Sequence, residues 1–383
     1  MKKLTIAITC YPTIGGSGVV ATNLGIELAR HGHKVHFITY ERPFSLPKHK
    51  NIFFHKVEFN DYSLFKYPDY TLPLAEKMVE VNEKYKLDLF HVHYAVPHAT
   101  AALLARKVIQ KVGNKKAPCL ITTLHGTDIT LLARDPNIDS IIRCSIEDSC
   151  AVTAVSNNLK QETTKILKTK KSIEVIYNFY HKKPTTKSRT VVRKELKVKD
   201  NDLLAVHLSN LRDVKRIPDL INIFGGLKKH PGIKLLILAG GSFKKFIPLV
   251  KKQKIQKQII VRENPSHIEN FLNASDFGIY TSKKESFGLG ILETLAFGKP
   301  ILATRAGGIP EVVAHKKTGL LFSVGDIKGF ISAIKKLNAD RKLLETMGKA
   351  GEKEAREKFS TKKIVRRYLN YYQKILQCKD CDC

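Results

Sequence analysis

Glu285 and Glu293 stand with seven residues between them, where a strand is expected to give way to a helix. The glycines between them would leave backbone amides at the start of that helix open to an anion. Carboxylates suit pairs of sugar hydroxyls, and the amides suit a diphosphate. The spacing therefore predicts a site for a phosphorylated sugar, although a solvated acid followed by an ordinary helix glutamate explains it equally well.

A cationic loop lies in the same half of the chain. Residues 209–216 read Ser-Asn-Leu-Arg-Asp-Val-Lys-Arg and follow an expected strand at residues 203–208. Arg212 and Lys215 would neutralise a diphosphate leaving group. Cations on loops are usually just exposed. The argument for a site is that ligand-type residues follow expected strands in both halves of the chain.

Histidines mark the first half. His125 follows an expected strand at residues 119–124, where ligands of doubly wound sheets collect. His91, His93 and His98 lie near another strand end, and strand alternation places His91 and His93 on one face. A metal cluster and simple core packing are both open interpretations of these three histidines.

A glycine-rich turn, residues 15–18, separates the first expected strand from the first expected helix. Small residues there let backbone amides and the helix dipole meet an anion. The turn does not match the G-x-G-x-x-G pattern of dinucleotide-binding proteins, and only Glu41 supports a dehydrogenase interpretation.

These residues need a scaffold in which strand ends meet. Apolar runs alternate with helical periods, which predicts parallel, doubly wound, Rossmann-like α/β sheets. The expected strands are residues 4–10, 34–39, 89–93, 119–124 and 151–155, then 203–208, 234–239, 259–261, 277–280 and 300–304. The expected helices include residues 19–30, 99–112, 138–149, 217–229 and 288–297.

The length of 383 residues is too great for one ordinary hydrophobic core, so we expect two domains facing a central cleft. An N-terminal Rossmann-like domain is expected at residues 1–180 and a C-terminal one at residues 201–360. A basic linker is expected at 181–200, an amphipathic terminal helix at 361–376 that packs on a lobe, and a Cys-rich tail at 377–383.

The net charge of +31 is compatible with nucleic acid, an acidic membrane surface or an anionic substrate, but the lysines are spread along the chain and indicate mostly solvated surface. No apolar run reaches about 18 residues, so neither a membrane anchor nor a signal peptide is expected. Isolated cysteines such as Cys10 indicate a reducing, cytoplasmic location. The tail cysteines Cys378, Cys381 and Cys383 lack a fourth metal ligand, so we interpret them as a nonessential tail.

Together these motifs resemble the retaining glycosyltransferases of the GT-B fold that share a Glu-x7-Glu motif, and the resemblance spans nearly the whole chain. More narrowly, several segments look like the branch of that family that attaches N-acetylglucosamine to L-malate at the start of bacillithiol biosynthesis. Four of these segments lie in the expected acceptor-binding domain. The segments are residues 10–22, 62–68, 91–98 and 124–129, together with 307–312.

The resemblance implies UDP-N-acetylglucosamine as donor, L-malate as acceptor, an α-linked product, and neither a metal nor a cofactor. It implies that Glu293 holds the ribose hydroxyls and Glu285 the far hydroxyls of the sugar. Lys215, helped by Arg212, would stabilise the departing diphosphate, and His125 would contact the sugar beside the anomeric carbon. The other implied donor-binding residues are Gly16, Ser17, Asn210, Arg262, Ser286, Phe287, Gly288, Leu289 and Gly290. The implied acceptor-binding residues are Lys66, Tyr94, Thr127 and Arg143, with Arg143 as the bidentate partner of malate.

The chain departs from the family pattern at two places. Asn210 stands where many members have arginine, and residues 239–242 read Ala-Gly-Gly-Ser in place of a Gly-Asp-Gly turn. One alternative keeps the fold and donor but uses a lipid or sugar-phosphate acceptor. A second is a basic nucleic-acid-binding protein, which would need a clustered basic face and stacking aromatics. The sequence leaves open whether the chain forms a homo-oligomer.

Overall fold

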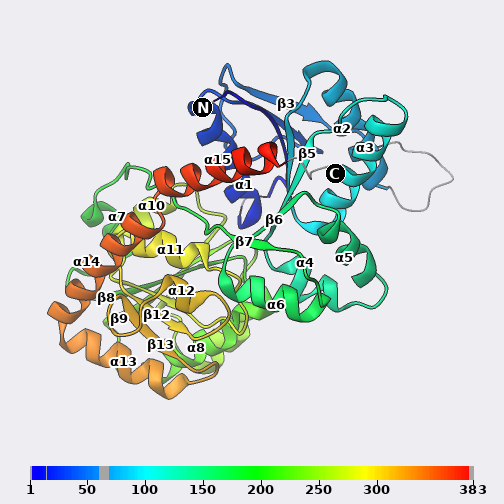
Figure 1. Cartoon of the computed structure of the whole chain (residues 1–383). Coiled ribbons are helices and arrows are strands. Elements are labelled where there is room, and N and C mark those ends of the chain that lie inside the picture. Colours follow the sequence, from blue (N-terminus) through cyan, green and yellow to red (C-terminus); the bar gives the residue numbers. More distant parts are fainter. Residues whose placement is uncertain (1, 14, 60–68, 379–383) are drawn as a thin grey trace. The chain divides into compact units, whose positions relative to one another are not determined.

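A computed structural model describes residues 2–13, 15–59 and 69–378 of the chain. The chain divides into two compact units. Unit 1 comprises Met1–Asn178 together with Thr361–Cys383, and unit 2 comprises Phe179–Ser360. The chain therefore leaves unit 1 once and returns to it with its last helix. Each unit is a parallel sheet flanked by helices (Figure 1).

Unit 1 is built on a parallel sheet in the order β3-β2-β1-β4-β5-β6-β7. Its central strands are buried along their whole length, as expected for parallel strands covered on both faces. The strands are β1 (Thr5–Thr9), β2 (Lys34–Thr39), β3 (Ile52–Lys56), β4 (Leu89–His93), β5 (Cys119–Leu124), β6 (Ala151–Ala154) and β7 (Ile173–Val175). β3 and β7, the two edge strands, are not among those expected from the sequence.

Apart from α15, the helices of unit 1 lie between successive strands, and the described residues between β2 and β3 form no helix. They are α1 (Ser17–Arg30), α2 (Thr71–Tyr85), α3 (Thr100–Lys111), α4 (Thr127–Thr130), α5 (Asp139–Glu147), α6 (Asn157–Leu167) and α15 (Thr361–Gln377), with short turns η1 (Ala95–Ala99) and η2 (Leu132–Arg134). α6 begins where the side chain of Ser156 accepts a hydrogen bond from the Leu159 amide at 3.0 Å, a standard N-cap. α2 and α3 pack on one face of the sheet against Ala7, Phe90 and Leu120.

Unit 2 repeats this topology with strand order β10-β9-β8-β11-β12-β13. Its strands are β8 (Leu203–Ser209), β9 (Ile233–Ala239), β10 (Ile259–Glu263), β11 (Phe277–Tyr280), β12 (Ile301–Thr304) and β13 (Gly319–Phe322). Its helices are α7 (Arg189–Glu195), α8 (Ile217–Gly226), α9 (Ile247–Gln253), α10 (Ile268–Ala274), α11 (Leu289–Ala296), α12 (Ile309–Val312), α13 (Ile327–Ala339) and α14 (Arg341–Lys358), with turns η3 (Asp213–Lys215) and η4 (Lys244–Phe246).

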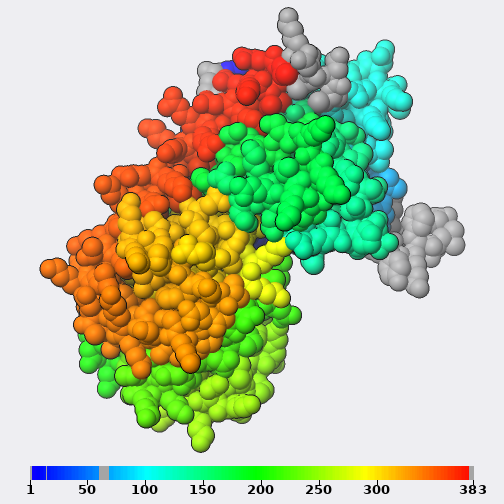
Figure 2. All heavy atoms as spheres, turned by 60° about the horizontal axis from the view of Figure 1, so that its bottom comes forward, coloured from blue at the N-terminus to red at the C-terminus, as the bar shows by residue number. Residues whose placement is uncertain are grey.

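Alternation along β8 shows how unit 2 buries both faces of its sheet. Leu203 and Ala205 join the core formed with α8, α9 and α13. Leu204 and Val206 join a second core, formed with α7 and α10. The helices α13 and α14 lie on the outside of this unit, where they form part of its surface (orange in Figure 2). The predicted fold class, two Rossmann-like doubly wound domains, is confirmed.

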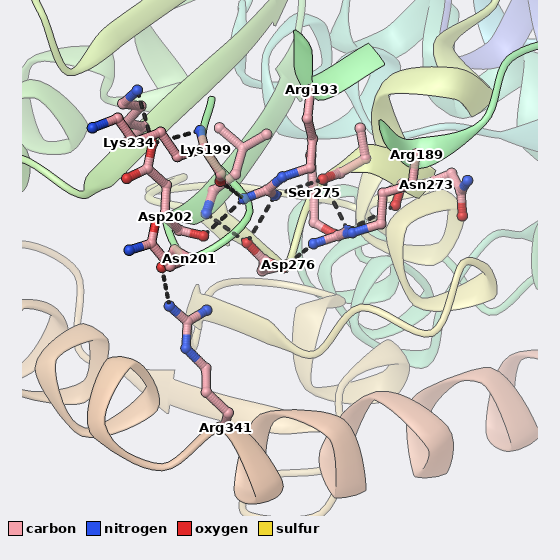
Figure 3. A network of polar contacts seen from close by, with 12 residues as sticks. Arg189, Arg193, Lys199, Asn201, Asp202, Lys234, Asn273, Ser275, Asp276 and Arg341 are labelled. Carbon is pink, nitrogen blue, oxygen red and sulfur yellow. Dashed lines mark hydrogen bonds and ion pairs between the residues drawn. The ribbon is translucent and has the colours of Figure 1, made fainter. Parts of the chain in front are cut away.

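Residues 181–200 differ from the basic linker expected from the sequence. They contain α7, which carries Arg193, labelled in Figure 3. The Arg193 side chain is only 2% exposed. The Arg193 guanidinium donates hydrogen bonds to the backbone oxygens of Ala274 (3.0 Å), Lys199 (2.6 Å) and Asp202 (2.8 Å) and pairs with Asp276 at 3.3 Å. The segment is therefore an ordered part of unit 2. Its many exposed lysines mask the few apolar side chains, such as Val192 and Leu196, that join the core.

The terminal helix α15 belongs to unit 1, where it lies beside α1 (Figure 1). Ile364, Val365, Tyr368, Leu369 and Tyr372 form its buried face, while Tyr371 and Ile375 are only partly buried. No helix within the described residues is long and apolar enough to cross a membrane.

Candidate active site

The residues proposed from sequence follow the carboxyl ends of strands in both units. In a doubly wound sheet, ligands bind at that edge, near the point where the strand order reverses. This point lies between β1 and β4 in unit 1 and between β8 and β11 in unit 2. Each unit therefore has a candidate binding site of its own at this edge.

In unit 1, Ser17, Tyr94 and His125 come together from three different strand ends. The Ser17 hydroxyl donates to the Tyr94 hydroxyl at 3.1 Å, and the rings of Tyr94 and His125 lie 5.3 Å apart. Tyr94 has a φ of 87°, an uncommon conformation for a residue with a side chain, and its amide donates to Thr123 at 2.9 Å. Gly16 stands just before α1 with a φ of 55°, which suits glycine.

His125 rests on a buried row of histidines. Its Nε2 lies 2.8 Å from Nδ1 of His93, and the two rings stack 5.0 Å apart. His91 packs on His93 at 4.6 Å. Burial lowers the pKa of His125 to about 3, lowers that of His91 to about 3, and holds that of His93 well below its usual value. These rings are therefore neutral at pH 7.

The terminal helix completes this row. The Tyr372 hydroxyl lies 2.7 Å from Nδ1 of His91, while the other ring nitrogen of His91 lies 2.7 Å from the Thr123 hydroxyl. Both nitrogens of His91 thus have partners. No group of three or more His, Cys, Asp or Glu side chains that could hold a metal occurs in the part of the chain that the structure describes.

Asp128 fixes the loop that carries His125. Its side chain is fully buried and accepts a hydrogen bond from the Gly126 amide at 2.8 Å. Burial raises the pKa of Asp128 to about 6, although backbone hydrogen bonds, including those from Gly126 and Ala95, act in the opposite direction. Thr127 opens the short helix α4 between these residues.

One predicted acceptor residue, Arg143, stands apart from this cluster. Arg143 lies on α5, is exposed, and pairs with Asp139 at 3.9 Å. Among the described residues, no hydrogen bond, ion pair or cation–π contact joins Arg143 to Tyr94 or His125. Lys66 lies outside the described residues.

In unit 2, the structure pairs the cationic loop with the first glutamate of the motif. Lys215 Nζ forms a short ion pair with Glu285, and the two side chains are 16% and 19% exposed. The Lys215 backbone oxygen accepts a hydrogen bond from the Thr281 hydroxyl at 3.0 Å, and the Lys283 amide donates to Val214 at 2.8 Å. These bonds tie the loop after β8 to the segment after β11.

The loop from Glu285 to Gly290 packs against the adjacent glycines Gly307 and Gly308. The Gly308 amide donates to the Glu285 backbone oxygen at 2.8 Å. A Cβ on Gly307 would stand 2.0 Å from that same oxygen, so only glycine allows this approach. Gly288, with a φ of 95°, precedes Leu289 at the start of α11. Ser286 is partly buried. The Phe287 ring is buried and packs against the ring of Phe359, with 5.6 Å between the ring centroids. Phe287 therefore contributes its backbone, and not its ring, to the surface of this loop.

Glu293 lies one turn into α11 and is 8% exposed. Burial raises the pKa of its carboxyl to about 8, and the charge of Lys183 only partly opposes this. The carboxyl makes no hydrogen bond or ion pair with the rest of the described chain. The neighbouring Thr294 bonds the Tyr280 hydroxyl at 2.7 Å, and that hydroxyl also donates to Gly290 at 2.8 Å.

The remaining residues that the sequence predicts to bind the donor lie at the same sheet edge. Asn210 and Arg212 are exposed on the loop after β8. Arg262 stands near the end of β10, with one guanidinium nitrogen donating to Val261 at 3.0 Å. Arg212, Asp213 and Arg216 of this loop line a surface hollow of about 300 Å³ together with Phe246.

Sequence reasoning missed Tyr372 and Gly307. The histidine motif was noticed, but its partner in α15 lies 281 residues away, and no local pattern signals so distant a contact. The Gly-Gly of residues 307–308 was seen only as a point of resemblance. Its signal was available, since adjacent glycines after a strand mark close backbone approach.

The chain is similar to known proteins along nearly its whole length. Residues 14–182 match the model described as Glycosyltransferase Family 4, and residues 188–354 match the model described as Glycosyl transferases group 1. The N-acetyl-alpha-D-glucosaminyl L-malate synthase of Bacillus anthracis is 42% identical over 378 residues, which cover 98% of each chain. An uncharacterised glycosyltransferase of Methanocaldococcus jannaschii is 26% identical over 98% of this chain and 99% of its own.

Solved structures share the fold. A glycosyltransferase from Rickettsia africae superposes with a TM-score of 0.81 at 23% identity, covering 98% of this chain and 100% of that one. The Anabaena protein HepE, solved with UDP and glucose, superposes with a TM-score of 0.77 at 18% identity, covering 97% and 99%.

Proposed function

Because the chain belongs to the family 4 glycosyltransferases of the GT-B fold, we propose that it transfers N-acetylglucosamine from UDP-N-acetylglucosamine to L-malate with retention. By the same similarity this is the first step of bacillithiol biosynthesis. The observation that carries the proposal is the 42% identity to the malate synthase of Bacillus anthracis over 98% of both chains, which includes the half that we expect to bind the acceptor.

The candidate site of unit 2 has the chemistry to bind the donor. Glu293, buried and without an internal partner, would accept hydrogen bonds from the ribose hydroxyls. The amides from Phe287 to Gly290 would face the sugar and the diphosphate. Arg212 and Arg262 add positive charge to the same sheet edge, with Asn210 and Ser286 as polar neighbours.

When the donor binds, the ion pair between Lys215 and Glu285 would open, and each side chain would contact the donor instead. In the free protein they neutralise each other. A donor diphosphate would draw the Lys215 ammonium, and the Glu285 carboxylate would then be free to accept from sugar hydroxyls. The lysine would stabilise the charge that develops on the leaving phosphate, which is the usual role of such preorganised cations.

We assign the contact with the acceptor to the candidate site of unit 1. His125 would contact the sugar, Gly16 and Ser17 would lie on the donor phosphate side, and Tyr94, Thr127, Arg143 and Lys66 would serve the acceptor. The bond from the anomeric carbon to the phosphate oxygen breaks and one to the malate hydroxyl forms on the same face. The malate hydroxyl proton passes to the departing phosphate oxygen, so no protein base is needed.

The location and the alternative acceptors follow from the same proposal. The buried thiol of Cys10, whose pKa burial raises to about 12, suits the reducing cytoplasm that we assign to the enzyme. A basic terminal helix would favour a lipid acceptor if its apolar face were free to meet a membrane. The apolar face of α15 is instead buried within unit 1. We therefore prefer a small anionic acceptor.

The proposal is tested by mixing the purified chain with UDP-N-acetylglucosamine and a panel of L-malate, D-malate, inositol phosphate and a polyprenyl phosphate. UDP release and product mass are followed together. We expect release with L-malate alone and its loss in Glu285→Ala and His125→Ala variants. Release with another acceptor alone would discard malate but keep the enzyme class.

A further inference from the structure

The contact between His93 and His125 sets the chemical form of His125. Nδ1 of His93 lies 2.8 Å from Nε2 of His125. Burial keeps both rings neutral at pH 7, so each carries one proton. A hydrogen bond between two neutral imidazoles needs one donor and one acceptor, which leaves two arrangements.

The two arrangements differ in whether Nε2 of His93 carries a proton. Nε2 of His93 is buried and has no hydrogen-bond partner among the described residues. If His125 were the donor, the proton of His93 would sit on this Nε2 as a buried N–H without an acceptor, which proteins avoid. If His93 is the donor, only a bare ring nitrogen is left there.

The same cluster contains an independent example of that second arrangement. Nδ1 of His98 contacts the backbone oxygen of His93, and a carbonyl can only accept, so the His98 proton is on Nδ1. Nε2 of His98 is then bare, buried and without a partner within the described chain. The interior of unit 1 thus accommodates a bare imidazole nitrogen at a neighbouring position.

We infer that His93 is a positioning residue that donates from Nδ1 to Nε2 of His125 and so holds the His125 proton on Nδ1. Nδ1 is the ring nitrogen of His125 left for a ligand, and it presents a donor with no lone pair. His125 therefore gives a hydrogen bond to an oxygen of the sugar or phosphate and cannot serve as the base for the acceptor hydroxyl. The inference rests on the proposed function only in placing His125 at the substrate.

Two further histidines supply internal references. The Leu4 amide donates to Nδ1 of His33 at 3.0 Å, so the His33 proton is on Nε2. Burial lowers the pKa of His33 and of His98 to about 4, so both are neutral at pH 7. His98 and His33 therefore serve as one reference for each tautomer.

The test is the long-range proton–nitrogen spectrum of the full chain labelled with ¹⁵N in its histidine rings, recorded near pH 7.5 without substrate. Single His33→Gln, His98→Gln and His125→Gln variants assign the three ring systems. We expect the His125 pattern to match that of His98 and to be the reverse of that of His33. A His125 pattern that matches His33 overturns the inference, whatever the substrates of the enzyme are.

A matched pair of variants then tests positioning. His93→Leu removes the donor, while His93→Asn keeps an amide N–H close to the position of Nδ1. We expect the leucine variant to lose the Nδ1 pattern of His125 and at least about fivefold in kcat, the worth of one hydrogen bond, and the asparagine variant to recover both. A leucine variant that folds by circular dichroism and keeps full kcat contradicts the role. If it does not fold, the wild-type spectrum still decides the tautomer.

Inactivity of the wild-type protein with UDP-N-acetylglucosamine and L-malate would count against the proposed function alone, because the spectrum of the free protein reads the tautomer without any substrate.

Discussion

Replacing Glu293 with glutamine should stabilise the protein at neutral pH. The folded chain raises the pKa of this carboxyl from 4.5 to about 8 through burial. Between those two values the unfolded state has released the proton that the folded state keeps, so stability falls as pH rises. The stability is fully present below pH 4.5 and is lost as pH approaches 8.

The size of the effect follows from the same shift. Each pH unit in this window costs about 1.4 kcal/mol, so at pH 7 the wild-type protein has lost about 3 kcal/mol relative to a neutral side chain. Glutamine has nearly the same shape and does not ionise. For a unit of this size, that difference corresponds to a rise in Tm of about 6–12 °C.

Differential scanning calorimetry at pH 5 and pH 7 measures the difference directly. Circular dichroism can support it, whereas tryptophan fluorescence cannot, because the chain contains no tryptophan. We expect a difference below about 1 kcal/mol at pH 5 and the full effect at pH 7. Glu285→Gln is the matched control, because removing the charge of Glu285 breaks its ion pair with Lys215 and should therefore not stabilise the protein. Equal stability of Glu293→Gln and wild type at pH 7 would refute the account of this carboxyl.

Three further substitutions have defined outcomes. Lys215→Met should lower kcat by about 10²–10³, since it removes the cation proposed to stabilise the leaving diphosphate, and a normal rate of UDP release would exclude that role. Arg193→Met should destabilise unit 2 by about 3–5 kcal/mol in calorimetry. The substitution leaves buried backbone oxygens without a hydrogen-bond donor and removes one of the cations that pair with Asp276. An unchanged thermal transition would show that the network in Figure 3 is dispensable. Tyr372→Phe should cost about 1–3 kcal/mol in denaturant unfolding by leaving Nδ1 of the buried His91 without its hydroxyl partner, and a change within error would contradict that pairing.

The fold class could be predicted because the central strands are short apolar runs separated by helical periods. Such strands, for example β5 and β9, are buried along nearly their whole length, and their pattern is visible in the sequence. The edge strand β3 is only partly buried, and β7 has three residues, so neither carries a clear period. The prediction of a linker at residues 181–200 differs from the structure for another reason. In the sequence, the buried Arg193 cannot be distinguished from the exposed basic residues of the same lysine-rich segment.

That Lys215 and Glu285 lie close together could be predicted, because parallel strands bring their carboxyl ends to one edge of a sheet. Lys215 and Glu285 are 70 residues apart, yet both follow central strands and meet in an ion pair. The chemical state of the residues could not be predicted in the same way. The burial that perturbs Glu293 and the ring-to-ring bond of His125 depend on tertiary contacts that leave no local signal.

The central claim is tested most directly by identifying the product formed from UDP-N-acetylglucosamine and L-malate. Mass spectrometry and the anomeric proton coupling in the NMR spectrum of the product give its composition and configuration. The account predicts UDP together with an α-linked N-acetylglucosaminyl malate. A β-linked product would contradict retention, and the absence of a malate adduct while another acceptor is glycosylated would contradict the proposed acceptor.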